Sequence, residues 1–107
     1  MKIKILIPRQ IKIATHPYEI VLKPHLRDDD KRLGSANHRI QRIEIEPDQC
    51  PSDLTVVLLH EIIHIIERAY NCDISDPDVD RIAQGMAEFL FNNLGIELDW
   101  GDIKKLE

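Results

Sequence analysis

The residues best suited to chemistry form a His-Glu-x-x-His pattern, His60-Glu61-Ile62-Ile63-His64, inside an apolar stretch. If this stretch is helical, positions 60 and 64 share one helix face, with Cβ atoms roughly 5–6 Å apart. Two imidazoles at that spacing can bind one zinc ion, and Glu61 is angled toward the same side, where a general base for a metal-bound water belongs. The pattern predicts His60 and His64 as zinc ligands and Glu61 as the catalytic base. The alternative is a pair of hydrogen-bonded core histidines beside a buried acid.

A third metal ligand must come from elsewhere, because catalytic zinc sites usually have three protein ligands and an open position for water. The candidates are the acids that open a second expected helix, Asp76, Asp78 and Asp80. We favour Asp76 as the third ligand. Asp80 then follows it at i+4, where it can hydrogen-bond a ligand histidine. The alternative is that these acids only cap and solvate the start of a helix.

Two helices are expected to carry these residues. The first covers 54–70, with Ser52 or Asp53 as N-cap and Pro51 just outside, and it is apolar nearly all round, which predicts burial. The second starts near Asp76. Its expected apolar face is formed by Val79, Ile82, Ala83, Met86, Phe89 and Leu90.

Short strands are expected before the first helix, at about 3–7 with an extended continuation over 11–14, at 18–23 between two prolines, and at 40–46, where Ile43 and Ile45 follow a period of two. Residues 24–37 are polar and rich in turn formers, and 96–107 is expected to be a tail with Trp100 packed back on the body. We therefore predict one α+β domain over 1–107, in which an antiparallel or mixed sheet of about three strands packs on both helices.

Composition excludes several function classes. A formal charge of −5 gives no support for nucleic-acid binding, and no segment approaches the ~20 apolar residues of a membrane span. Cys50 and Cys72 flank the first helix and are too far apart to form a disulfide, which fits a reducing compartment. We therefore expect a cytoplasmic protein, and we do not expect either cysteine to bind zinc.

The helix with His60-Glu61-Ile62-Ile63-His64 followed by Ile65-Ile66-Glu67 resembles the active-site helix of gluzincins. It is most similar to the minimal forms in phages and mobile elements, and distantly similar to ImmA/IrrE-type peptidases. The segment 79–86 is similar to the second helix of those proteins. The resemblance implies a zincin-like fold, zinc on both histidines, Glu61 as base, and an acidic third ligand from the second helix. Gluzincins use glutamate there, whereas this chain has only aspartates near the expected place.

The resulting hypothesis is a zinc-dependent metallopeptidase that acts on a peptide or protein substrate. The candidate oxyanion donors are Tyr70, His38 and Arg39. The strand at 40–46 could be the sheet edge that binds an extended peptide, or else a solvated edge protected by its charged residues. His38, like His16 and His25, otherwise reads as a surface residue, and Glu67 could hold a neighbour near the site or pair with Arg68. One alternative is an inert zincin scaffold with a regulatory or binding role and a structural metal. Another is hydrolysis of a non-peptide bond.

Overall fold

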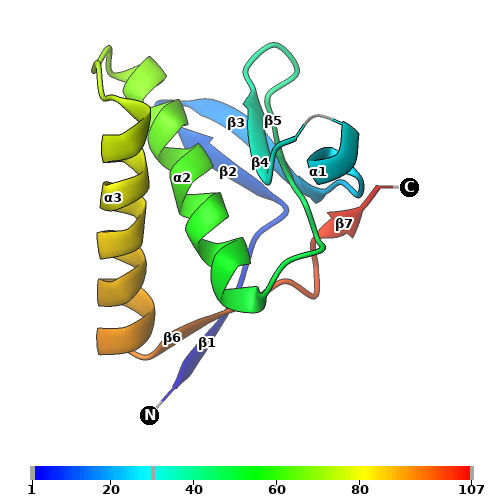
Figure 1. The fold of residues 1–107 in the computed structure, drawn as a ribbon, viewed down its shortest axis with the longest axis vertical. Helices are drawn as coiled ribbons and strands as arrows, with labels where there is room; N and C mark the ends of the chain where they lie inside the picture. Colours follow the sequence, from blue (N-terminus) through cyan, green and yellow to red (C-terminus); the bar gives the residue numbers. More distant parts are fainter. Residues whose placement is uncertain (1, 30, 107) are drawn as a thin grey trace.

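The computed structural model describes residues 2–29 and 31–106, which form an α+β fold. Figure 1 shows the order of its elements and the helix α2 lying between the strands and the helix α3. The strands are β1 (Ile3–Leu6), β2 (Gln10–Ile13), β3 (His16–Leu22), β4 (Gly34–Asn37), β5 (Arg42–Ile45), β6 (Ile96–Asp99) and β7 (Lys104–Lys105). The helices are α1 (Leu26–Asp29), α2 (Pro51–Ala69), α3 (Asp76–Ala87) and a π-helical continuation of α3, η1 (Glu88–Asn93).

The main sheet has five strands, so the prediction of about three was too low. Four of the strands lie in the order β2-β3-β5-β4. The fifth strand, β7, pairs with β3 outside this path. The sheet is mixed, since β3 runs parallel to β5 and β7, whereas β2–β3 and β4–β5 are antiparallel. The expectation that 40–46 forms an edge was wrong, because β5 lies between β3 and β4. The edge is β4, whose small residues lack the apolar alternation by which a strand is recognised in a sequence.

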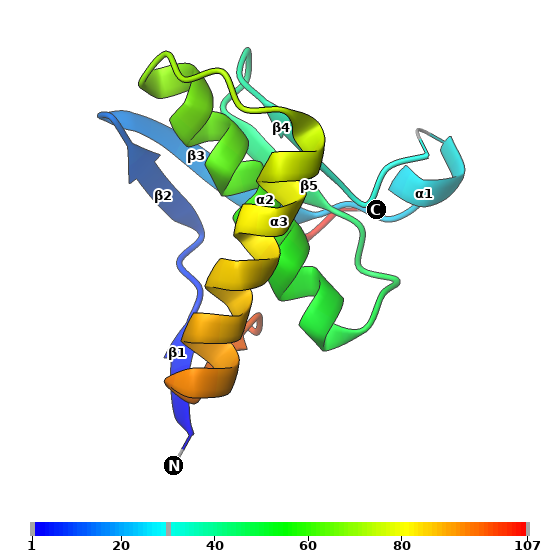
Figure 2. The same ribbon diagram turned by 60° about the vertical axis from the view of Figure 1, so that its left-hand side comes forward.

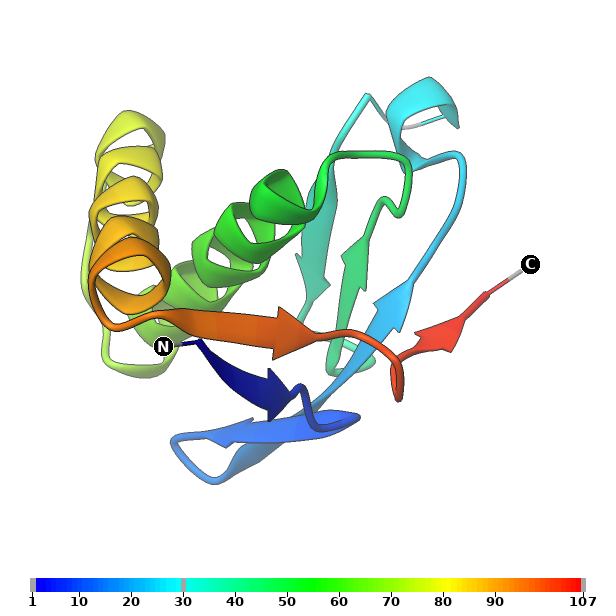
Figure 3. The same cartoon turned by 90° about the horizontal axis from the view of Figure 1, so that it is seen from below.

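The ends of the chain form a second, two-stranded parallel sheet, in which Ile3 of β1 is in register with Ile96 of β6. The expectation of an irregular tail over 96–107 was therefore wrong. These strands exist through pairing with partners far away in the sequence, which local patterns do not reveal. Trp100 packs against the core, as expected. Figure 3 shows β6 passing beneath α2 toward the sheet.

The core lies between the main sheet and α2. Alternate residues Ile43 and Ile45 of β5 are fully buried and form one cluster with Leu58 and Ile65 of α2. The helix begins at Pro51 rather than after it, since proline fits the first helical position. Only Leu58, Glu61 and Ile65 of α2 are fully buried, so the prediction of burial all round was wrong.

Helix α3 packs along α2, and Figure 2 shows the two helices lying side by side. Its buried residues are Val79, Ala83 and Ala87. The expected apolar face was thus partly wrong, because Ile82, Met86 and Phe89 are exposed. Valine and alanine allow the two helix axes to come close, which places the first turn of α3 beside the middle of α2. Among the described residues, no helix is both long and apolar enough to cross a membrane.

Candidate metal centre

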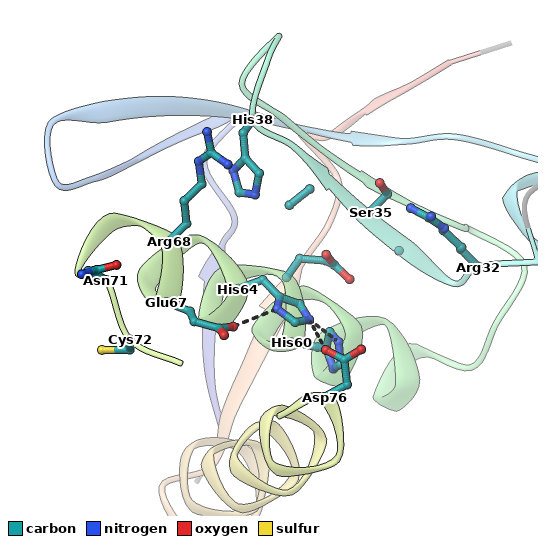
Figure 4. Close-up of a pocket in the computed structure, with 13 residues that line it drawn as sticks. Arg32, Ser35, His38, His60, His64, Glu67, Arg68, Asn71, Cys72 and Asp76 are labelled. Carbon is teal, nitrogen blue, oxygen red and sulfur yellow. Dashed lines mark hydrogen bonds and ion pairs between the residues drawn. The ribbon is translucent and has the colours of Figure 1, made fainter. Parts of the chain in front are cut away.

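The two histidines of the His-Glu-x-x-His pattern lie side by side on α2. Their Nε2 atoms are 3.0 Å apart, and their ring centroids are 4.7 Å apart. Both side chains are partly buried, and Figure 4 shows them at the floor of a cavity, pointing toward α3. The helical spacing of four residues thus brings two nitrogen atoms with ligand capacity to one point.

Each imidazole is held at its other nitrogen by a carboxylate. Asp80 Oδ1 of α3 lies 2.8 Å from His60 Nδ1, and Glu67 Oε1 of α2 lies 3.2 Å from His64 Nδ1. An ionised carboxylate can only accept, so both Nδ1–H groups donate. This leaves the lone pairs of the two Nε2 atoms facing each other. Two ligands at 2.0–2.1 Å from a tetrahedral zinc are roughly 3.3 Å apart, so this donor pair fits a metal ion.

The three acids proposed as third ligand point in different directions. Asp76 Oδ1 lies 3.7 Å from His64 Nε2, and its side chain is 85% exposed. Asp80 is engaged with His60, whereas Asp78 pairs with Arg81 at 2.8 Å and faces away. No group of three or more His, Cys, Asp or Glu side chains within 2–29 and 31–106 is arranged closely enough to hold a metal ion. The structure therefore brings two of the expected ligands together, with Asp76 nearby on the exposed start of α3.

Glu67 connects His64 to the segment that follows α2. Besides its contact with His64, it accepts a hydrogen bond from the backbone N–H of Ile74 at 3.0 Å. This backbone hydrogen bond, with help from His64, lowers the pKa of Glu67 below its usual range, against a smaller opposing effect of burial. The carboxylate therefore stays ionised and orients the His64 ring. The signal in the sequence is its position three residues after His64, one turn along the same face.

Glu61 is buried between α2 and β4. Burial raises the pKa of its carboxyl group, and the neighbouring His60 and His64 oppose that rise. Among the described residues it accepts no side-chain hydrogen bond, so its oxygen atoms remain available to the cavity. Gly34 of β4 makes this position possible, because a Cβ there would lie 3.2 Å from Glu61 Oε2. Sequence reasoning missed this role of Gly34.

One cavity of about 790 Å³ lies between α2, β4 and the start of α3, and its lining includes His60, Glu61, His64, Glu67, Asp76 and Gly34 but not Asp80. Arg32, His38, Arg68 and Cys72 also line it, although only His38 among them was considered as a functional residue from the sequence. The β4–β5 turn and the end of α2 both reach over the cavity (Figure 4). Cys50 and Cys72 are not bonded to each other, as expected.

Of the three donors considered for an oxyanion, only His38 lines the cavity. Arg39 and Tyr70 are both exposed outside it. The ring of His38 is held by the hydroxyl group of Tyr18, which lies 2.8 Å from His38 Nδ1. The site therefore includes one residue from the β4–β5 turn, and it is one of three oxyanion donors that the sequence could not rank.

Comparison of the chain with protein-family models, with curated proteins and with solved structures finds no match. The functional argument consequently depends on the geometry of the site.

Proposed function

We propose that the chain is a small zinc-dependent metallopeptidase with a zincin-like arrangement of α2 and α3. The observation that carries this proposal is the convergence of His60 Nε2 and His64 Nε2 at 3.0 Å beside Glu61, in one cavity. Burying two imidazoles and an acid on an apolar helix is costly unless their polar atoms have partners. With Nδ1–H on both rings, the two Nε2 lone pairs face each other at 3.0 Å, and one metal ion would bind both.

In this proposal His60 and His64 hold the ion, and Asp76 is the candidate third ligand. Asp80 and Glu67 keep both imidazoles in the tautomer that leaves Nε2 free. When bound, zinc would polarise the carbonyl group of the scissile peptide bond and lower the pKa of its bound water toward about 7.

Glu61 is the proton carrier. Its carboxylate is desolvated, which raises its affinity for a proton, and it faces the cavity without a competing side-chain hydrogen bond. In the proposed reaction it accepts a proton from the attacking water and gives the proton to the leaving amine. A pKa raised by burial makes Glu61 a better proton acceptor than an exposed carboxylate, which suits the first of these steps.

The peptide substrate has a suitable docking edge. Strand β4 pairs with β5 on one side only, and its Gly34, Ser35 and Ala36 line the cavity. An extended peptide can pair with such an edge through backbone hydrogen bonds. Small side chains there leave room for the peptide to approach Glu61.

The test compares wild type with Glu61→Gln, both loaded with zinc, on a peptide library read by mass spectrometry. Glutamine has nearly the same shape and no buried charge, so the variant is expected to fold and bind zinc. We expect new peptide termini with wild type and none with the variant. An absence of new termini with both proteins would instead favour the inert scaffold with a structural metal, and equal cleavage by both would contradict the role of Glu61. The inert scaffold predicts a lower melting temperature for His60→Ala in the presence of zinc and no cleavage by any form.

A further inference from the structure

We propose that His38 and Arg68 form a carboxylate-binding subsite at one end of the cavity, with Tyr18 as a positioning residue behind His38. Figure 4 shows His38 and Arg68 next to each other on the opposite side of the cavity from Arg32. The subsite assigns a substrate class to the proposed peptidase, namely peptides that carry a carboxylate near the scissile bond. In that sense it rests on the proposed function.

The first element of the subsite is the fixed orientation of His38. Tyr18 is 4% exposed, and His38 Nδ1, at 2.8 Å, is the sole hydrogen-bond partner of its hydroxyl group among the described residues. If Nδ1 carried the proton, the phenol would have to accept, and its own buried O–H would have no acceptor. The phenol therefore donates to Nδ1. The proton of the neutral ring is then on Nε2, as a donor toward the cavity.

The environment disfavours the charged form of this ring. Burial lowers the pKa of His38, and the nearby positive groups of Arg68 and His64 lower it further. A neutral ring with Nδ1 occupied has one defined tautomer. Arg68 and His64 both lie near enough to His38 to disfavour a positive charge on its ring.

The second element is the charge of Arg68. No carboxylate of residues 2–29 or 31–106 lies within 4.0 Å of its guanidinium group. Of the acids that line the same cavity, Glu67 accepts a hydrogen bond from Ile74 N–H, Asp76 faces His64, and Glu61 lies against Gly34 of β4. Arg32, which lines the same cavity, likewise has no carboxylate within 4.0 Å among the described residues, but only Arg68 lies beside His38 (Figure 4). The charge of Arg68 is available to a ligand.

Together these groups match one kind of ligand. A guanidinium group and a neighbouring N–H donor fit the two oxygen atoms of a carboxylate, and charge-assisted hydrogen bonds are about twice as strong as neutral ones. An amide in the same place offers one acceptor and no charge. The ligand is therefore an aspartate or glutamate side chain, or the carboxylate at the end of a peptide.

The first experiment reads the tautomer of His38 by nitrogen-15 NMR on the metal-free full chain. We expect the Nε2–H form in wild type and a mixture of tautomers in Tyr18→Phe, which keeps the ring but removes the hydroxyl group. An Nδ1–H form in wild type would overturn the proposal. This readout depends on neither metal nor activity.

The second experiment measures binding of three peptides to the same metal-free protein, so that no carboxylate can bind to zinc. The probes are acetyl-Ala-Glu-Ala-amide, acetyl-Ala-Gln-Ala-amide and acetyl-Ala-Gln-Ala with a free carboxyl end. We expect the glutamate peptide or the free-ended peptide to bind at least about 5-fold more tightly than the neutral one, which distinguishes a side chain from a chain end. Chemical-shift changes should centre on His38 and Arg68.

Variants distinguish a specific carboxylate subsite from non-specific electrostatic attraction of an anionic peptide. Arg68→Gln and His38→Gln should each abolish the preference, whereas Arg39→Gln should keep it. Arg39 is the matched control, because it carries the same charge next to His38 but does not line the cavity. Equal binding of all three peptides by wild type, or an equal loss in Arg39→Gln, contradicts the subsite. A failure of zinc binding or of cleavage leaves these measurements unaffected and bears only on the peptidase proposal.

Discussion

Gly34 of β4 faces Val57 of α2 so closely that a Cβ atom at position 34 would lie 2.5 Å from Val57 Cγ1. Real side chains do not approach to that distance, so the sheet and the helix can pack as they do only if residue 34 is glycine. The same contact places Glu61, one turn after Val57, against the strand. Packing of the sheet on α2 and placement of Glu61 thus both depend on the absence of a side chain at position 34.

Gly34→Ala is expected to destabilise the protein by about 1–3 kcal/mol, because a methyl group must be forced into a filled space. Urea unfolding followed by circular dichroism measures this change. Gly85→Ala is the matched control, since a Cβ there meets nothing within 4 Å and alanine favours the helix by roughly 0.5–1 kcal/mol. Adding Val57→Ala to Gly34→Ala should recover part of the loss. An unchanged midpoint in Gly34→Ala would show that α2 is not packed on β4 in this way.

Asp80→Asn is expected to weaken zinc binding by roughly 10–100-fold, because Asp80 orients His60 through its Nδ1–H group. Competition with a coloured chelator gives the affinity. The control is Asp78→Asn, whose carboxylate pairs with Arg81 on the outer side of α3. Equal affinities for the two variants would mean that Asp80 does not act through His60.

Asp76→Asn tests the third ligand. If Asp76 binds the ion directly, its loss should weaken zinc binding by at least about 100-fold, the upper end of what an orienting residue contributes. The same competition assay applies. Asp73→Asn, an exposed acid just before α3 and outside the cavity, should leave the affinity unchanged. If Asp76→Asn binds zinc as wild type does, a water molecule or another acid completes the site.

Glu46 links stability to pH. It is 3% exposed and accepts hydrogen bonds from the backbone N–H groups of Arg27 at 3.0 Å and Asp48 at 3.3 Å. The first of these bonds is the main cause of a lowered pKa in the folded protein, with burial acting in the opposite direction. The ionised form therefore adds stability that is fully present above the unfolded pKa of about 4.3 and is lost as pH falls through the lower folded pKa.

Glu46→Gln should accordingly cost about 1.5–3 kcal/mol at neutral pH, as for hydrogen bonds to a charged group, and less in acid, where wild type loses the same interaction. Urea unfolding at both pH values gives the comparison. The exposed Glu97 of β6 provides the control substitution, Glu97→Gln. A cost for Glu46→Gln that stays the same in acid would contradict this account.

Local patterns predicted the elements with strong periodicity. The two long helices and the burial of Ile43 and Ile45 follow from spacing alone. The strands β4, β6 and β7 could not be predicted, because their residues show little alternation and their pairing depends on distant partners. The exposed face of α3 was mispredicted for a related reason, since close packing on α2 favours valine and alanine over larger apolar residues.

The residues of the candidate site also fall into two groups, those that local spacing predicts and those that depend on contacts between elements. A spacing of four residues on a helix is enough to bring His60 and His64 together, and helical spacing likewise puts Glu67 beside His64. Contacts between elements are a different matter. Gly34 lies against Glu61, and Tyr18 forms a hydrogen bond with His38. Each contact joins residues that are far apart in the sequence, so no local pattern predicts it. The direction of Asp76 and Asp80 depends on how α3 is placed on α2.

The central claim is that His60 and His64 bind one metal ion, and the most direct measurement is metal content per chain. Elemental analysis would be made on protein purified without a histidine tag and supplied with zinc before dialysis. We predict close to one zinc per chain in wild type, none in His64→Ala, and an unchanged content in His16→Ala, a histidine exposed on β3. Absence of zinc from wild type, or its retention in His64→Ala, would contradict the proposed metal centre.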